Sequence, residues 1–534
     1  MRAMSVRKSS MVERLVRLVV ACIGSCAALC AMGQTVNVPF SALRPTSGEA
    51  AAAHALVVEL SPREALAGVH LHLALAEAPQ PGMRYVAWVN GNQVADTDTD
   101  TNRALQTLAL STPAFEPGVN SIQLALVARD APLDARLDPD IARRNAAPVD
   151  DARSSVSLDF AGLRPNPAPL LSQLPIAFDR RARLPRTVTV ELAAGKRPAE
   201  SLAAESLAAA AWAVQAIAVQ MSHSDVMVRY RHAADEAGRN ASDGPSEAFA
   251  SDAAARAGDV LIVGPRDALH GTVPATIERA IAGPFLGIFP ANDGKSVVVV
   301  ISGQTGSDCL TAARAFAQAL SDRGGALPNT AQATVRDAGS IGSSQPRLTV
   351  SLANDDPALM QAALSFAALD ARHRGAMTDM DFHFGGRIDN AGLYLGPQSA
   401  LPRNVMRRLP TFHAPGPGQA VSLRQGLPTD TSPGTPLVAL LGSDDSSAAR
   451  AVDMLRDPKV WALFSQTSTL FDTRSSTAHA LPTLPHSWIG TLHLLVTDHA
   501  VFWPLLGGLL LIAFFTLNLT LKVQTQKRLG LDNR

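Results

Sequence analysis

The sequence predicts a mixed β and α/β fold, in which an antiparallel β-sandwich precedes two doubly wound α/β domains and a C-terminal transmembrane helix. Three observations lead to this prediction. Short runs of alternating polarity fill residues 34–165, continuous apolar runs alternate with Ala-rich stretches over 184–475, and residues 500–521 contain no charged side chain. Alternating runs are typical of half-buried antiparallel strands, and continuous apolar runs are typical of buried parallel strands.

Residues 1–33 have the character of a secretory signal peptide. Basic residues precede the apolar run 18–32, and small residues stand before Gln34. A basic segment, a short apolar segment and a small-residue cleavage site define such peptides. The run is shorter than the roughly 20 residues that cross a bilayer. A retained N-terminal anchor is the alternative.

Residues 34–165 carry the turn signals of an antiparallel sandwich. The run 85–89 leads into Asn90-Gly91, a strong hairpin signal because both residues tolerate positive φ. Residues 117–120 then turn the chain into another expected strand over 122–127. Several short strands at this spacing predict a β-sandwich.

Residues 184–475 show the same α/β pattern twice. The strand 259–265 ends in Gly264-Pro265, and the strand 393–397 ends in Gly396-Pro397. In both halves a later apolar strand is followed by Ala-Ala-Arg. Paired landmarks in the same order predict an internal duplication of a parallel, doubly wound sheet.

The C-terminal segment has the features of a membrane span. Residues 500–521 would extend about 33 Å as a helix, enough to cross the hydrocarbon core. Lys522, Lys527 and Arg528 follow at once, which predicts a cytoplasmic tail over 522–534. We therefore expect a single-pass protein of the cell inner membrane, with the bulk of the chain in the periplasm.

Residues 485–499 form an expected interfacial amphipathic segment before the span. Trp488 and Trp503 would anchor it at the membrane surface, and Gly507-Gly508 would let a partner helix approach closely. The alternative for this segment is a tether held clear of the bilayer.

The charge balance and the cysteine content exclude several functional classes. The 534 residues include 47 Lys and Arg and 47 Asp and Glu, so no cationic excess is available to bind nucleic acid. The apolar content of 47% argues against a disordered protein. Only Cys309 lies outside the first apolar run, so the body of the chain cannot form an internal disulfide.

The order of these motifs resembles the family of periplasmic regulatory subunits of bacterial cellulose synthase, which includes the cyclic di-GMP-binding regulatory proteins of that enzyme. The resemblance rests on residues 86–91, 117–120, 259–265 and 283–288, together with the apolar C-terminal segment and its basic tail. It covers nearly the whole chain after residue 33. The family has a second β domain between its α/β domains, where this chain has only residues 321–346, so the chain looks like a shortened member.

The resemblance implies a jelly-roll-like sandwich of the carbohydrate-binding type and two flavodoxin-like domains. It also implies a non-catalytic regulatory subunit that supports the catalytic subunit of cellulose synthase, a membrane glycosyltransferase, and guides the nascent β-glucan. A stand-alone anchored periplasmic protein that binds a small or saccharide ligand is the alternative. The expected segments are a signal peptide (1–33), a β-sandwich (34–165), α/β domain 1 (184–324), α/β domain 2 (346–475), an interfacial segment (485–499), a membrane helix (500–521) and a basic tail (522–534).

One candidate anion site lies between a strand and a helix of the first α/β domain. Gly303, Thr305, Gly306 and Ser307 stand where free backbone amides and the helix dipole favour a phosphate. The alternative is a glycine turn with Ser307 as the helix cap. No nucleophile elbow, Walker loop or zinc spacing occurs in the sequence, so we expect no enzyme, no cofactor and no metal.

Two aromatic residues are candidates for carbohydrate binding. Tyr85 and Trp88 have opposite parity on one strand, so at most one faces the core and the other could stack on a pyranose ring. Packing within the protein is the alternative.

Three weaker patterns complete the candidates. Asp96, Asp98 and Asp100 could offer oxygens to calcium, and His70 with His72 lacks a third ligand for a metal. The pair Arg403 and Arg407 has the RxxxR spacing of phosphate clamps, but its companion motif over 430–434 is only approximate. We interpret the first two patterns as solvated polar side chains and the arginines as surface charge.

Overall fold

The computed structural model describes most of the chain between Gly33 and Arg528, and the chain divides into two compact units. The first unit comprises residues 1–348 and 363–382, and the second comprises 349–362 and 383–534. The described residues are 33–45, 55–75, 81–99, 105–130, 147–193, 200–232, 258–321, 327–335, 345–385, 392–401, 406, 409, 412, 414–424, 437–481 and 499–528. Residues 1–32 of the expected signal peptide lie outside them, as do nearly all of the expected interfacial segment and residues 529–534 of the tail.

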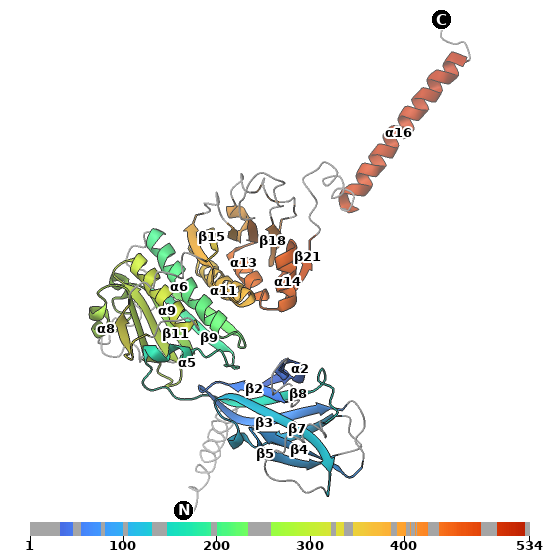
Figure 1. Cartoon of the computed structure of the whole chain (residues 1–534). Helices are drawn as coiled ribbons and strands as arrows, with labels where there is room; N and C mark the ends of the chain where they lie inside the picture. The colour runs from blue at the N-terminus through green and yellow to red at the C-terminus, as the bar shows by residue number, and fades with distance from the viewer. Residues whose placement is uncertain are drawn as a thin grey trace, which may run out of the picture. The chain divides into compact units, whose positions relative to one another are not determined.

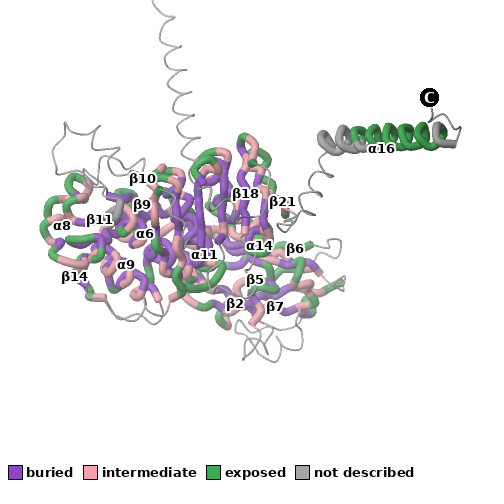
Figure 2. The backbone as a smooth tube through the Cα atoms, turned by 90° about the horizontal axis from the view of Figure 1, so that it is seen from above, coloured by how far each residue is buried: buried purple, intermediate pink, exposed green. Residues whose placement is uncertain are grey.

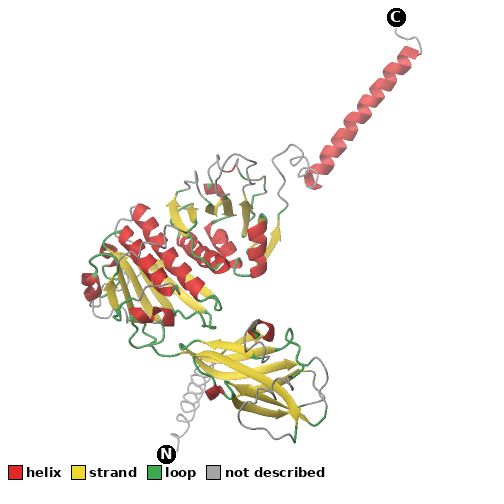
Figure 3. Ribbon diagram, viewed as in Figure 1, coloured by secondary structure: helices red, strands yellow, loops and turns green. Residues whose placement is uncertain are grey.

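The N-terminal part of the first unit consists of two four-stranded antiparallel sheets (Figures 1 and 3). One sheet has the order β1 (Gln34–Pro39), β8 (Ser155–Leu163), β3 (Glu64–Ala74) and β6 (Leu105–Leu110). The other has the order β2 (Leu56–Leu60), β7 (Gly118–Ala128), β4 (Met83–Val89) and β5 (Asn92–Asp98). Short helical turns α2 (Phe40–Leu43) and η1 (Thr112–Ala114) lie in the connections.

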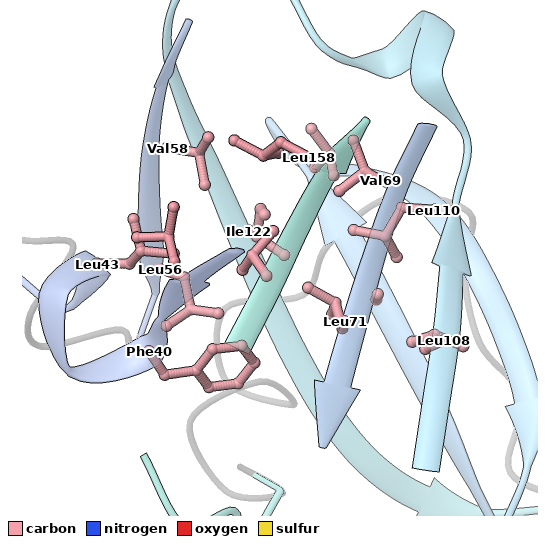
Figure 4. Close-up of a cluster of buried hydrophobic side chains, with 14 of the residues drawn as sticks. Phe40, Leu43, Leu56, Val58, Val69, Leu71, Leu108, Leu110, Ile122 and Leu158 are labelled. Atoms are coloured by element: carbon pink, nitrogen blue, oxygen red, sulfur yellow. The ribbon is translucent and has the colours of Figure 1, made fainter. Parts of the chain in front are cut away.

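A single apolar core lies between these two sheets. Leu71 and Leu158 project into it from one sheet, and Val58 and Ile122 project from the other (Figure 4). Phe40 of α2 also enters this core and is 1% exposed. Burial alternates along these strands because each strand contributes every second side chain to this core, as expected for a sandwich.

The hairpin between β4 and β5 is confirmed at the predicted residues. Asn90 has φ 51° and Gly91 has φ 82°, and the two strands pair on either side of them. A two-residue turn with two positive φ angles matches the right-handed twist of the strands it joins.

The rest of the first unit contains a six-stranded mixed sheet. Its order is β10 (Val226–His232), β9 (Arg186–Leu192), β11 (Asp259–Pro265), β13 (Val297–Gly303), β12 (Phe285–Pro290) and β14 (Gln332–Thr334). The first four strands are parallel, and β12 and β14 are antiparallel to their neighbours. The helical elements are η2 (Leu171–Gln173), α5 (Leu174–Ala177), α6 (Glu200–Gln220), η3 (Arg266–Leu269), α8 (Ala275–Ala280) and α9 (Gly306–Leu320).

A second mixed sheet has the order β16 (Asp379–Phe384), β15 (Arg347–Leu352), β17 (Leu393–Pro397), β19 (Val438–Gly442), β18 (Gln419–Arg424), β20 (Thr469–Asp472) and β21 (Thr477–Ala480). Its helical elements are α11 (Pro357–Arg374), η4 (Gln398–Ala400), α13 (Asp445–Met454) and α14 (Pro458–Gln466). The parallel strands β15, β17 and β19 are followed by the antiparallel strand β18.

The strand orders of the two mixed sheets correspond strand for strand, from β10-β9-β11-β13-β12-β14 to β16-β15-β17-β19-β18-β20. In both sheets, the fourth strand in sequence pairs antiparallel with the fifth. Equivalent connections carry α6 and α11, η3 and η4, and α9 and α13. The duplication that the sequence predicts is therefore visible in the topology.

The end of α11 and the start of β16 belong to the first unit through contacts with α6. Trp212 Nε1 of α6 donates to Asp379 Oδ1 at 3.1 Å, and the Arg314 guanidinium lies 5.6 Å from the indole centroid. The Gln215 amide pairs with the Thr378 backbone in both directions, at 3.1 and 2.7 Å. These partly buried polar contacts explain why residues 363–382 group with the first unit.

The predicted C-terminal transmembrane helix is wrong. Residues His499–Arg528 form the helix α16, but no helix in the described part of the chain is both long enough and apolar enough to cross a membrane. The described residues form a mixed α/β fold with four sheets, and the predicted single-pass anchor in the inner membrane is wrong for the same reason.

A buried ion pair fixes the amino ends of the parallel strands in the first mixed sheet. Arg186 of β9 contacts Asp259 Oδ2 of β11 through Nε at 3.0 Å and Nη2 at 2.6 Å. Asp259 Oδ1 accepts from the Val297 amide of β13 at 3.0 Å. The two side chains are only 5% and 1% exposed, so neither charge can be solvated if its partner is lost.

We predict that Arg186→Ala lowers the free energy of unfolding by about 3–5 kcal/mol, because it leaves the Asp259 carboxylate buried without its cation. Arg347→Ala is the matched control, since this arginine is 86% exposed and lies 3.6 Å from Asp379. Its loss should cost less than about 1 kcal/mol. Urea unfolding of both variants measures the difference, and equal losses would contradict a structural role for the buried pair.

Candidate functional site

Doubly wound sheets bind ligands at the carboxyl ends of their parallel strands, beside the point where the strand order reverses. In the first mixed sheet this edge is formed by the ends of β9, β11 and β13. A Cβ atom at Gly264 would lie 2.8 Å from the Ala193 Cβ, so the ends of β11 and β9 touch. This close packing requires glycine at position 264, and residues 194–199, which follow β9 at this edge, lie outside the described residues.

The predicted anion site at the start of α9 is filled by a carboxylate of the protein. Thr305 is the N-cap, and Asp308 completes a capping box. Asp308 Oδ2 accepts from the amides of Gln304 at 2.9 Å and Thr305 at 3.2 Å, and Thr305 Oγ1 accepts from the Asp308 amide at 3.2 Å. These are amides that a phosphate would use. The cap is Thr305, not the expected Ser307.

Two glycines of this site are required for close packing. A Cβ at Gly303 would overlap the Asp308 side chain, and a Cβ at Gly306 would overlap the Glu205 carboxylate of α6. Two carboxylates thus occupy the positive end of α9, where the helix dipole favours them and where they repel a phosphate. The role of Asp308 could be predicted from the sequence, because it is the third residue after a threonine that can cap a helix. The role of Glu205 could not, because it is distant in the sequence.

The strand ends at the corresponding edge of the second mixed sheet are packed in a similar way. A Cβ at Gly396 would overlap the Ala353 side chain, so the ends of β17 and β15 also touch. The Asp444 side chain caps α13 and accepts from the Ser447 amide at 2.7 Å. A Cβ at Gly442 would lie 2.5 Å from the Ala448 amide nitrogen. Both copies therefore use glycines and a side-chain cap at equivalent positions.

The second copy differs in one polar pair. Tyr394 stands where the first copy has Ile262, and Asp445 stands where it has Gly306. The Tyr394 hydroxyl and Asp445 Oδ1 are buried and have no hydrogen-bond partner among the described residues. Burial raises the pKa of Tyr394, and the nearby Asp445 charge raises it further. The phenol therefore stays protonated at neutral pH and cannot act as a general base.

Neither candidate sugar-binding ring is available to a ligand. Tyr85 and Trp88 do point to opposite faces of β4, but each is only 1% exposed. Tyr85 belongs to the core between the sheets, where burial raises its pKa to about 12. Trp88 packs with Val86, Ala125 and Val127 on the other face. A pyranose cannot stack on a ring that other atoms already cover.

The two candidate groups of metal ligands are committed to other partners. Asp96 Oδ2 accepts from Arg84 at 2.9 Å, and Asp98 pairs with Arg129, while Asp100 lies outside the described residues. His72 Nε2 lies 2.7 Å from Ser157 Oγ, and His70 Nε2 lies 3.3 Å from Asp159. Over the residues that the structure describes, no three His, Cys, Asp or Glu side chains gather in a metal-binding arrangement.

The predicted partner contacts are only partly described. Gly507 and Gly508 lie on α16 with open space around both, and α16 is exposed at each residue whose side chain is described (green in Figure 2). Trp503 belongs to the same helix, but its side chain lies outside the description, and Trp488 lies outside it entirely. Arg403, Arg407 and the loop 430–434 also lie outside it, so the expected phosphate clamp is not seen.

A comparison with models of known protein families finds no match to this chain, and no curated protein matches it either.

We predict that Asp308→Ala lowers the free energy of unfolding by about 1 kcal/mol, because it exposes the capped amides of α9. Ser307→Ala should change it by less than about 0.5 kcal/mol, since the Ser307 side chain is exposed and does not cap the helix. Thermal or urea unfolding checks both values. If inorganic phosphate or a flavin phosphate raised the Tm of the unmodified protein, the site would not be closed.

Proposed function

We propose that the chain is a non-catalytic accessory subunit of a bacterial cellulose synthase. In this role it supports the catalytic glycosyltransferase and guides the growing β-glucan. It carries out no chemistry of its own, and its folded domains serve as contact surfaces for the enzyme and the polymer.

One structural observation supports this proposal most strongly. At the start of α9, where a doubly wound enzyme would bind a phosphate, Asp308 accepts from the amides of Gln304 and Thr305. At the start of α13, the equivalent helix of the second sheet, Asp444 is the cap and accepts from the Ser447 amide. Helix ends that are already capped by carboxylates of the protein favour a scaffolding role over phosphate-dependent catalysis.

The proposed partner rests on a sequence resemblance. The order of β motifs, duplicated α/β motifs and an apolar C-terminal segment resembles that of the regulatory subunits of bacterial cellulose synthase. The stand-alone binding protein remains the competing proposal, and it predicts no stable association with a glycosyltransferase.

Helix α16 offers the surface for such an association. Apolar side chains including Leu511, Ile512 and Phe515 are 58%, 67% and 61% exposed, which is unusual for a helix without a partner. Gly507 and Gly508 leave space beside the helix, so a partner helix could approach its backbone closely. We assign the contact with the synthase to this helix.

The test is co-purification of the glycosyltransferase with the tagged full chain from a detergent extract of the source cells. We predict that the unmodified chain retains it and that the double variant Gly507→Leu, Gly508→Leu retains at least about fivefold less. Leucine favours a helix over glycine by roughly 1 kcal/mol per residue, so the variant should not unfold α16.

Thr525→Leu, on the exposed surface of the same helix, is the matched control and should retain the partner normally. Equal retention by all three proteins would move the contact away from the glycines. Failure of the unmodified chain to retain a glycosyltransferase would contradict the proposed function and favour the stand-alone protein.

A further inference from the structure

The second unit contains an open groove that the sequence analysis did not anticipate. It lies between the end of α13, the start of α14 and the turn that joins β20 to β21, and its volume is about 410 Å³. Pockets that hold small organic ligands typically span roughly 300–1,000 Å³. The groove lies apart from the carboxyl edge, because α13 begins at that edge and the groove is at its other end.

The charges around the groove balance one another. Arg450 and the carboxylates Asp453 and Asp457 line it, and Arg456 lies 3.8 Å from Asp453 just beside it. A ligand with a net charge would leave one of these groups uncompensated, so the groove suits a neutral ligand. The carboxylates of Asp453 and Asp457 can accept hydrogen bonds from a ligand, and the Arg450 guanidinium can donate them.

The remaining lining residues supply hydroxyls and an apolar surface. Thr473 and Ser476 contribute the hydroxyls, and Met454 and Val460 contribute the apolar contacts. Adjacent hydroxyls on a sugar ring pair well with carboxylate and guanidinium groups, which accept or donate two parallel hydrogen bonds. The C–H face of the ring packs on apolar side chains. This combination matches the chemistry of a neutral saccharide.

The backbone at Ser476 gives an independent reason to assign a function to this groove. Ser476 has φ 54°, and Asn90 of the β4–β5 hairpin is the other non-glycine residue with positive φ among the described residues. Asparagine is common in that conformation, whereas serine is not. Glycine would adopt this positive φ angle with less strain than serine does. Strained residues of this kind are often found in binding sites, where the side chain has a function.

The turn is held firmly in this position. The Thr473 amide and hydroxyl both donate to the Gly418 carbonyl, at 3.0 and 2.7 Å, and the Arg474 amide donates to Asp472 Oδ1 at 3.0 Å. Within α13, Arg450 Nε donates to the Ser446 carbonyl at 3.3 Å. Thr473 and Arg450 are therefore held in place before a ligand arrives, which lowers the entropy that these two side chains lose on binding.

We propose that this groove binds a short stretch of a neutral saccharide chain. The saccharide chemistry follows from the groove, while the choice of β-linked glucan rests on the proposed function. In that case the second α/β domain provides a contact for the growing polymer, in place of the buried rings Tyr85 and Trp88.

The experiment titrates cellohexaose into the purified full chain by isothermal calorimetry. We expect saturable binding that Asp453→Asn weakens about tenfold, the usual effect of losing a charge-assisted hydrogen bond. The Asp453 side chain is 48% exposed, so the neutral amide should be tolerated by the fold. Asp355→Asn, an exposed carboxylate of the same unit outside the groove, should bind like the unmodified protein.

A second variant separates binding from folding. Ser476→Gly relieves the positive φ angle and should raise the Tm, yet it removes a hydroxyl and should weaken cellohexaose binding about threefold. A merely structural role for Ser476 would change the Tm without changing binding. The inference is overturned if cellohexaose does not bind, or if Asp453→Asn and Ser476→Gly both bind it normally.

These outcomes are distinct from those that test the proposed function. Loss of saccharide binding with an intact association with the glycosyltransferase would overturn only the inference about the groove. Saccharide binding without any such association would support the groove and contradict the accessory role.

Discussion

The buried pair of Arg186 and Asp259 connects the parallel strands of the first mixed sheet at their amino ends. It joins β9 to β11, and through the Val297 amide it also reaches β13, so three parallel strands share one charge pair. The same edge receives the sandwich: Arg63 donates to the Arg164 carbonyl at 2.9 Å and also to that of Lys295. Glu64 accepts from the Leu184 amide at 2.7 Å. Burial raises the pKa of Glu64, and the hydrogen bonds that its carboxylate accepts from backbone amides oppose that rise. The junction between the sandwich and the sheet is therefore a polar network rather than an apolar contact.

The two edges of the mixed sheets thus have different roles. The amino edge of the first carries the polar connections, and the carboxyl edges of both carry close glycine contacts and helix caps. Gly264 and Gly396 allow neighbouring strand ends to touch, and Thr305 and Asp444 cap the following helices. Both copies have these contacts, although Ile262 and Gly306 of the first copy are replaced by Tyr394 and Asp445 in the second. Packing at the strand ends therefore tolerates these two replacements.

Several elements could be predicted because their causes are local. The Asn90-Gly91 hairpin follows from two residues that tolerate positive φ, and β11 follows from a continuous apolar run. The burial of both Tyr85 and Trp88 could not be predicted, because parity separates the faces of a strand but does not reveal what covers each face. The same limit applies to Glu205, which fills the space beside Gly306 from a distant helix. The transmembrane prediction counted uncharged residues over 500–521, whereas no helix in the described part of the chain is long and apolar enough to cross a membrane.

Reconstitution of glucan synthesis separates an accessory role from a catalytic one. The measurement compares glucose incorporation from a nucleotide-activated donor by the catalytic glycosyltransferase alone, by the full chain alone, and by both together. An accessory role predicts no incorporation by the chain alone and a clear increase when it is added to the glycosyltransferase. Incorporation by the chain alone, or no effect of the chain on the glycosyltransferase, would contradict that role.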